Sequence, residues 1–153
     1  MKKFDYLFIR FLKYGTLSST LVLIGIVCVQ IYARFFMENA PSWTEELSRM
    51  VFIYTVSFAS GLAFRQGYFI QLDLWHSSIN SRFSWALDTM SSVTALILFI
   101  LLLAFGIQFL VMGMVERSPG LAIPMAWSFG AMVLLGFSIT WFAFRKVIAQ
   151  FRH

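Results

Sequence analysis

The stretch TMSSVTALILFILLLAFGIQFLVMGMV, residues 89–115, contains no charged side chain. About 20 consecutive apolar residues are enough to cross the hydrocarbon core of a bilayer as a helix. The stretch therefore predicts a membrane-spanning helix, and the composition of the chain agrees. Of its 153 residues, 59% are hydrophobic and 12% are charged, whereas a typical soluble domain has about 25% charged residues. A soluble fold could not bury so much apolar surface.

Three further segments have the length and apolarity of membrane spans. Uncharged runs cover residues 14–33 and 121–144, and a shorter run covers residues 50–64. We predict a single all-α integral membrane domain over residues 1–153, with four transmembrane helices at about residues 14–35, 45–65, 86–115 and 122–145. The first uncharged run is longer than the apolar core of a usual signal peptide, so we expect it to be retained.

The lysines and arginines predict the orientation of these spans. Nine of the twelve lie before the first span, between the second and third, or after the fourth: Lys2, Lys3, Arg10, Lys13, Arg65, Arg82, Arg145, Lys146 and Arg152. The other three are Arg34, Arg49 and Arg117. Because cytoplasmic segments are enriched in Lys and Arg, we predict that both termini lie in the cytoplasm. In a Gram-negative bacterium the protein would then lie in the inner membrane, with residues 38–50 facing the periplasm. This distribution of Lys and Arg explains the net charge of +5, which therefore does not indicate that the protein binds nucleic acid.

The segment between the second and third spans has an amphipathic pattern. Phe69, Leu72, Trp75 and Ile79 are spaced three and four residues apart, and polar side chains fill most other positions. This pattern predicts a short interfacial helix at about residues 68–80, lying flat on the cytoplasmic surface. A structured loop that happens to contain aromatic residues is the alternative.

The distribution of chemically active side chains disfavours catalysis and ion conduction by this chain. No ionisable group lies near the middle of a predicted span, where transporters of ions or protons usually carry one. The only cysteine is Cys28, and the two histidines, His76 and His153, lie outside the spans. We therefore expect no enzyme activity, no cofactor and no metal site.

Small residues recur at helical spacing in the second span. Ser57 and Gly61 are four residues apart, as are Ala59 and Ala63. Such spacing lets two helix backbones approach closely. The face they form either packs inside the four-helix domain or docks against another membrane protein.

The stretch ENAPSWTEELSRM, residues 38–50, opens the second span and concentrates acidic side chains. Ser42 and Glu45 fit a capping box, and Glu45 is also placed to pair with Arg49. Trp43 suits the membrane interface. Glu46 has no evident partner, so Arg34 or a residue of another chain would have to supply one. We predict that Trp43 and Glu46 face a partner.

A segment with two prolines, SPGLAIPMAW at residues 118–127, precedes the fourth span. Pro119 and Pro124 bracket Gly120, and Pro124 suits the first turn of a helix because that position needs no N–H. The segment is either a tight reversal or a rigid docking surface on the outer side.

Together these motifs resemble the DctQ-like small membrane subunit of tripartite ATP-independent periplasmic (TRAP) transporters. Relatives of that kind open the second span with Trp-x-Glu-Glu-Leu and end it with Arg, then carry an apolar stretch with Asp, and precede the fourth span with Pro-x-Leu-x-Ile-Pro. The matching residues here are Trp43, Glu45, Glu46, Leu47, Arg65, Ile70, Leu72, Asp73, Pro119, Leu121, Ile123 and Pro124. The order and spacing of the motifs extend the resemblance over essentially the whole chain.

The resemblance implies a non-catalytic small permease subunit. It would scaffold a large elevator subunit during sodium-driven uptake of an organic acid, which a periplasmic substrate-binding protein delivers. The partners would be that large subunit, bound laterally, the binding protein, bound transiently, and the lipid bilayer. Partner contacts are expected among Trp43, Glu45, Glu46, Arg49, Ser57, Gly61, Arg65, Asp73, Pro119 and Pro124. The alternative is a self-contained, homo-oligomeric small transporter or channel.

Overall fold

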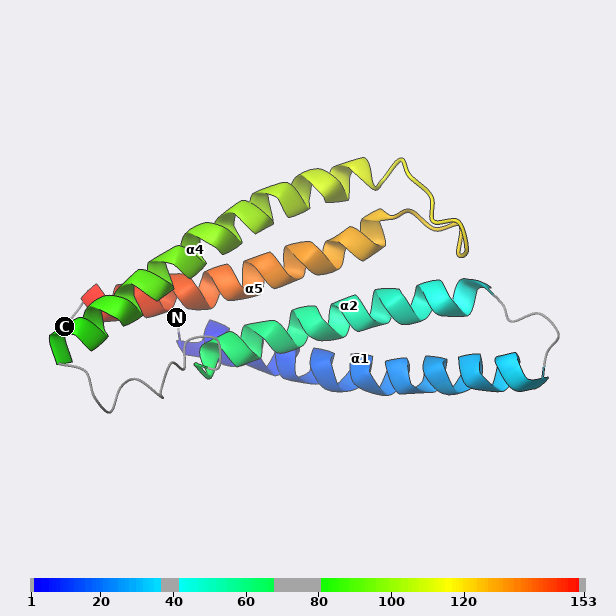
Figure 1. The fold of residues 1–153 in the computed structure, drawn as a ribbon, viewed down its shortest axis with the longest axis horizontal. Helices are drawn as coiled ribbons and strands as arrows, with labels where there is room; N and C mark the ends of the chain where they lie inside the picture. Colours follow the sequence, from blue (N-terminus) through cyan, green and yellow to red (C-terminus); the bar gives the residue numbers. More distant parts are fainter. Residues whose placement is uncertain (1, 37–41, 68–80, 152–153) are drawn as a thin grey trace.

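The computed structural model describes residues 2–36, 42–67 and 81–151, and four long helices make up most of this part of the chain. They are α1 (Lys2–Phe36), α2 (Ser42–Arg65), α4 (Ser81–Met112) and α5 (Ala126–Phe151), as Figure 1 shows. Each contains a segment long and apolar enough to cross a membrane. The prediction of four membrane-spanning helices is confirmed. The predicted interfacial helix at residues 68–80, with Asp73, lies outside the described residues.

The helices differ from the predicted spans mainly at their ends. α1 begins at Lys2 rather than near residue 14, and α5 begins at Ala126 rather than at residue 122. An uncharged run marks only the part of a helix that hydrocarbon surrounds, and the helix continues into the interface, where charged side chains reach headgroups and water. Pro124 lies two residues before α5, because residues 113–125 form a structured loop.

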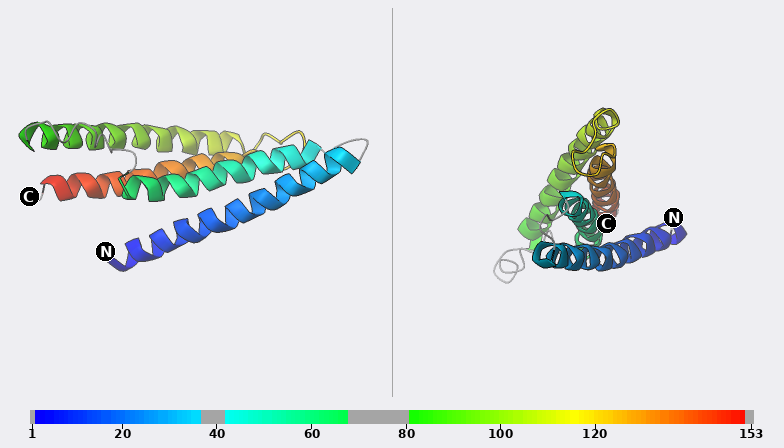
Figure 2. Two further views of the ribbon diagram at one scale, coloured as in Figure 1. Left: turned by 60° about the horizontal axis from the view of Figure 1, so that its bottom comes forward. Right: turned by 90° about the vertical axis from the view of Figure 1, so that its right-hand side faces the viewer.

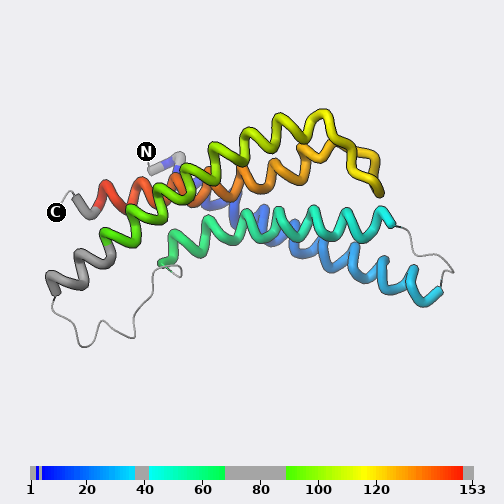
Figure 3. Tube along the Cα trace, turned by 45° about the horizontal axis from the view of Figure 1, so that its top comes forward, coloured from blue at the N-terminus to red at the C-terminus, as the bar shows by residue number. Residues whose placement is uncertain are grey.

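The helices are packed in the order α1, α2, α5, α4, which is not their order in the chain. Extensive contacts join α1 to α2, α2 to α5, and α5 to α4. Figures 2 and 3 show the resulting curved row, in which α1 is inclined to the other three helices. The beginning of α1 and the end of α5 lie at the same end of the row (Figure 1), here called the terminal end. The opposite end carries the loop of residues 113–125 and is called the loop end.

The densest packing lies toward the terminal end, where α1, α2 and α5 meet. Its core consists of Leu12, Phe64, Ile139, Phe142 and Ala143. Close approach of the backbones requires a glycine there: a Cβ on Gly61 would lie 2.8 Å from the Cβ of Ser138 and 3.0 Å from a methyl group of Leu12. Ser57, one turn before Gly61, is fully buried. For Ser57 and Gly61 these contacts support packing within the chain.

Large apolar side chains cover the outward faces of α1 and α4. Leu21 on α1 is 70% exposed and Leu98 on α4 is 58% exposed. In water such faces would cause aggregation, whereas in a bilayer they contact lipid tails or another membrane protein. The exposed faces therefore agree with a membrane environment for this row of helices.

Candidate functional site

The loop between α4 and α5 has a fixed hairpin-like structure. The Ser118 amide donates to the Ile123 carbonyl at 2.9 Å, and the Met125 amide donates to the Glu116 carbonyl at 2.9 Å. Between these bonds Ala122 has a positive φ of 56°, a conformation that side-chain-bearing residues rarely adopt. Backbone hydrogen bonds thus close the loop around the segment that the two prolines bracket.

Glu46 fastens this loop to the first turns of α2. Its carboxylate accepts hydrogen bonds from the amides of Gly120 at 2.8 Å and Leu121 at 2.9 Å, and another from the Ser118 hydroxyl. The partner that sequence reasoning sought in Arg34 or in another chain is thus supplied by the chain itself, 72 to 75 residues away. The sequence cannot show that a backbone amide will bind a distant carboxylate, because every residue except proline has such an amide. Gly120 between two prolines indicates only a loop, in which backbone N–H groups are left outside helices.

The neighbouring carboxylate behaves differently. Glu45 forms the predicted ion pair with Arg49, with 3.1 Å between Oε1 and Nη2, and both side chains are about 70% exposed. α2 begins at Ser42, where the capping box was predicted. The hydrogen bonds of that cap remain a prediction. Trp43 is 43% exposed at the same end.

These residues surround a shallow cavity of about 330 Å³ at the loop end. Its lining combines the start of α2 with the loop, from Ser42, Glu45, Glu46, Arg49, Pro119 and Gly120. A second hydrogen bond, from the Tyr54 hydroxyl to the Trp127 carbonyl at 2.7 Å, ties α2 to the start of α5. The loop end is consequently a rigid surface with an exposed ion pair and an exposed indole.

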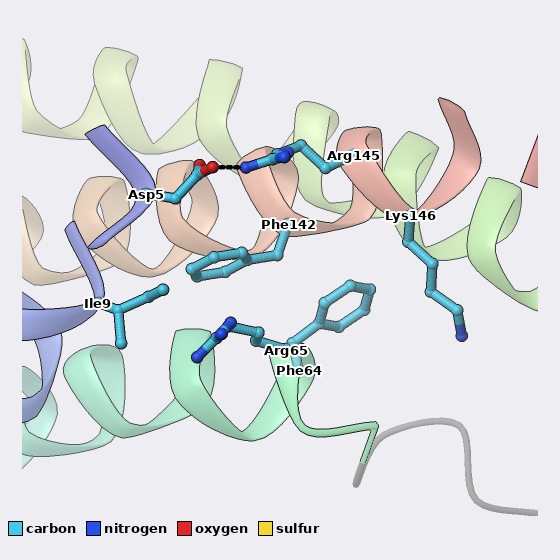
Figure 4. A pocket seen from close by; sticks show the side chains of 7 residues that line it. All are labelled: Asp5, Ile9, Phe64, Arg65, Phe142, Arg145 and Lys146. Atoms are coloured by element: carbon cyan, nitrogen blue, oxygen red, sulfur yellow. Dashed lines mark ion pairs between the residues drawn. The ribbon is translucent and has the colours of Figure 1, made fainter. Parts of the chain in front are cut away.

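The terminal end holds a second polar cluster, which the sequence analysis did not single out. Asp5 on α1 forms an ion pair with Arg145 on α5 and also accepts a hydrogen bond of 3.2 Å from the indole Nε1 of Trp141. Figure 4 shows Asp5 and Arg145 beside a cavity of about 400 Å³ that Arg65 and Lys146 also line. A single acid near the start of a basic segment gives no sign in the sequence that it pairs with a residue 140 positions later.

Replacing Asp5 by asparagine should reduce the free energy of unfolding by about 1–3 kcal/mol, since it leaves the Arg145 guanidinium without its counter-ion. The side chain of Asp5 is only 14% exposed, so water replaces the lost partner poorly. Thermal unfolding of the purified chain in detergent measures the effect. Glu116→Gln, which removes an exposed carboxylate at the other end, is the control. Equal melting temperatures for the two variants would contradict this role of Asp5.

Between the two ends, the described part of the helices has few side chains that could bind an ion. The buried hydroxyl of Ser57 donates to the Ile53 carbonyl at 2.8 Å, and that of Ser138 donates to the Leu135 carbonyl at 3.0 Å. Both hydroxyls are thus satisfied by the backbone of their own helix. Among the described residues no group of three or more His, Cys, Asp or Glu side chains is placed to hold a metal ion.

Four apolar helices with charged clusters confined to their ends define a multi-pass membrane protein. Residues 23–153 match the model of a protein family described as the DctQ component of tripartite ATP-independent periplasmic transporters. The chain belongs to this family, which is a family of transporter components and not of enzymes. The earlier resemblance is confirmed.

A comparison with curated proteins agrees with this assignment. The chain is 18% identical over 141 residues to a Haemophilus influenzae protein assigned as a TRAP transporter small permease. The match covers 92% of this chain and 86% of that protein. Both chains are therefore of similar extent, and the similarity includes all four helices.

Proposed function

We propose that this protein is the small permease subunit that scaffolds the large elevator subunit of a TRAP transporter, during sodium-driven uptake of an organic acid delivered by a binding protein. The observation that supports this role best is the contrast between its fixed ends and its exposed sides. Glu46 ties α2 to the loop, and Asp5 ties α1 to α5. A subunit that stays still while a neighbour moves needs such ties.

The open arrangement of the helices supports a role beside a partner. The two outer helices of the row each have one broad interface with a neighbouring helix: α1 with α2, and α4 with α5. Within the row, the buried hydroxyls of Ser57 and Ser138 are each satisfied by the backbone of their own helix. A self-contained transporter, by contrast, needs polar or ionisable groups along a path through the bilayer.

The loop end is the better candidate for contact with a periplasmic protein. Trp43, the Glu45–Arg49 ion pair and Pro119 are all exposed there. Exposed aromatic and arginine side chains are enriched in protein interfaces. Among the predicted contacts we propose the exposed residues for this role, since Ser57 and Gly61 are buried against other helices of this chain and Glu46 holds the loop in place.

Reconstituted transport tests the proposal. Proteoliposomes that contain both membrane subunits, with the binding protein outside and an inward sodium gradient, should take up a labelled organic acid bound by that protein. Omission of this chain should reduce uptake at least tenfold, and the chain should co-purify with the large subunit. Uptake unaffected by the omission would contradict the scaffold role. Transport by liposomes that contain this chain alone would instead favour the homo-oligomeric transporter.

A further inference from the structure

The cavity at the terminal end carries positive charge that the described part of the chain does not neutralise. Asp5 is the only acid among the described residues that line it, and it is engaged by Arg145 and by the Trp141 indole. Within the described residues Arg65 and Lys146 form no ion pair. Two cationic groups on different helices, α2 and α5, thus line the same cavity, as Figure 4 shows.

The depth of this cavity corresponds to the headgroups of a bilayer. Arg65 is the last residue of α2, and Glu46 lies in the first turns of the same helix, 19 positions earlier. At 1.5 Å per residue these two positions are about 28 Å apart, close to the thickness of the hydrocarbon core. When Glu46 lies at one membrane surface, Arg65 therefore lies at the other, level with lipid phosphates.

The remaining walls of the cavity are apolar. Ile9, Phe64 and Phe142 come from the three helices that converge there, and the two phenylalanines are nearly buried. A ligand with a negative headgroup and an apolar body matches such a surface, with its charge near Arg65 and Lys146. Arginine binds phosphate oxygens through two parallel N–H groups, and lysine adds a compact charge.

We propose that this cavity binds the phosphate group of an anionic phospholipid, held by Arg65 and Lys146 between α1, α2 and α5. Basic pockets between transmembrane helices on the cytoplasmic side are typical sites for such headgroups, and the Lys and Arg distribution predicts the cytoplasmic side for this end. Arg145 stabilises the helix packing through Asp5, and Arg65 and Lys146, which have no ion pair with any described residue, supply the binding charge.

Native mass spectrometry of the full chain released from phosphatidylcholine nanodiscs, with or without added phosphatidylglycerol, tests the site. The wild-type chain should retain phosphatidylglycerol in preference to phosphatidylcholine. The double variant Arg65→Gln/Lys146→Gln should reduce that retention about tenfold. The matched control is Arg10→Gln/Lys13→Gln, which removes the same charge from outside the cavity and should retain the lipid. The swap Arg65→Lys/Lys146→Arg should also retain it.

Two results would overturn the proposal. One is equal retention of phosphatidylglycerol by Arg65→Gln/Lys146→Gln and by the control. The other is displacement of the lipid from the wild-type chain by millimolar inorganic phosphate, which would assign the site to a soluble anion. The wild-type competition needs no variant, so it decides between lipid and free phosphate even where a substitution impairs folding.

Discussion

Replacing Glu46 by glutamine is expected to release the loop of residues 118–121 from α2. The carboxylate receives three hydrogen bonds, from the amides of Gly120 and Leu121 and from the Ser118 hydroxyl. The glutamine oxygen can still accept from the Gly120 and Leu121 amides, which share Oε2, but it lacks the charge that strengthens these bonds. Its NH₂ group replaces the oxygen that accepts from the Ser118 hydroxyl. Hydrogen–deuterium exchange at the Gly120 and Leu121 amides should accelerate about tenfold or more, because exchange follows local opening.

The neighbouring acid supplies a matched control for this experiment. Glu45→Gln removes the same charge one residue away, but Glu45 pairs only with exposed Arg49 among the described residues, so exchange in the loop should stay unchanged. Gly120→Ala offers an independent route, since its Cβ would lie 2.5 Å from Oε2 of Glu46. It should accelerate exchange although Glu46 is intact. If Glu45→Gln accelerates exchange in the loop as much as Glu46→Gln does, the claim that Glu46 specifically holds the loop is wrong.

Replacing Gly61 by valine is expected to separate α2 from α1 and α5. The new Cβ alone would lie 2.8 Å from the Cβ and Oγ of Ser138, closer than such atoms approach in folded proteins. Overpacking of this kind costs about 1–3 kcal/mol of the free energy of unfolding. Denaturation of the purified chain in mixed micelles measures the loss. Gly25→Val on α1 is the control, because no atom lies within 4 Å of a Cβ built there.

A compensating substitution separates a local clash from a general effect of side-chain size. Gly61→Ala combined with Ser138→Gly adds a Cβ to α2 and removes the Ser138 Cβ and Oγ that it would meet, so it should recover most of the stability lost in Gly61→Ala. Gly61→Ala combined with Ser138→Ala keeps the clashing Cβ atom and should recover little. Equal recovery in both double variants would show that the contact with the Ser138 Cβ does not limit the packing.

The four spans could be predicted from the sequence, because a helix that crosses the hydrocarbon core needs a long run of uncharged, apolar residues, and such runs are visible in the sequence. The Glu45–Arg49 pair also followed, since a spacing of four residues is a local rule of helices. The order of packing did not follow. Residues such as Leu12, Gly61 and Ser138 come together only when three helices are aligned, and uniformly apolar spans leave that alignment open.

The polar clusters at the two ends show the same limit. Glu46 is visible in the sequence as an acid without a partner, but its partners are largely backbone amides, which every residue carries. Asp5 has no distinguishing mark in the sequence, because basic residues surround it and its partner Arg145 lies on the last helix. Both contacts depend on tertiary structure. For this reason the sequence predicted where charges gather, while the pairs themselves required the arrangement of the helices.

The position of α2 next to α5 has a consequence for biosynthesis. The chain forms two helical hairpins, α1 with α2 and α4 with α5, and the seam between α2 and α5 joins them. Since α5 is made last, the first hairpin enters the membrane before the seam exists. During that interval the seam face of α2, with Gly61 and Phe64, lies open to lipid. The packing of this face is completed only when α5 brings Ser138, Ile139 and Phe142 against it.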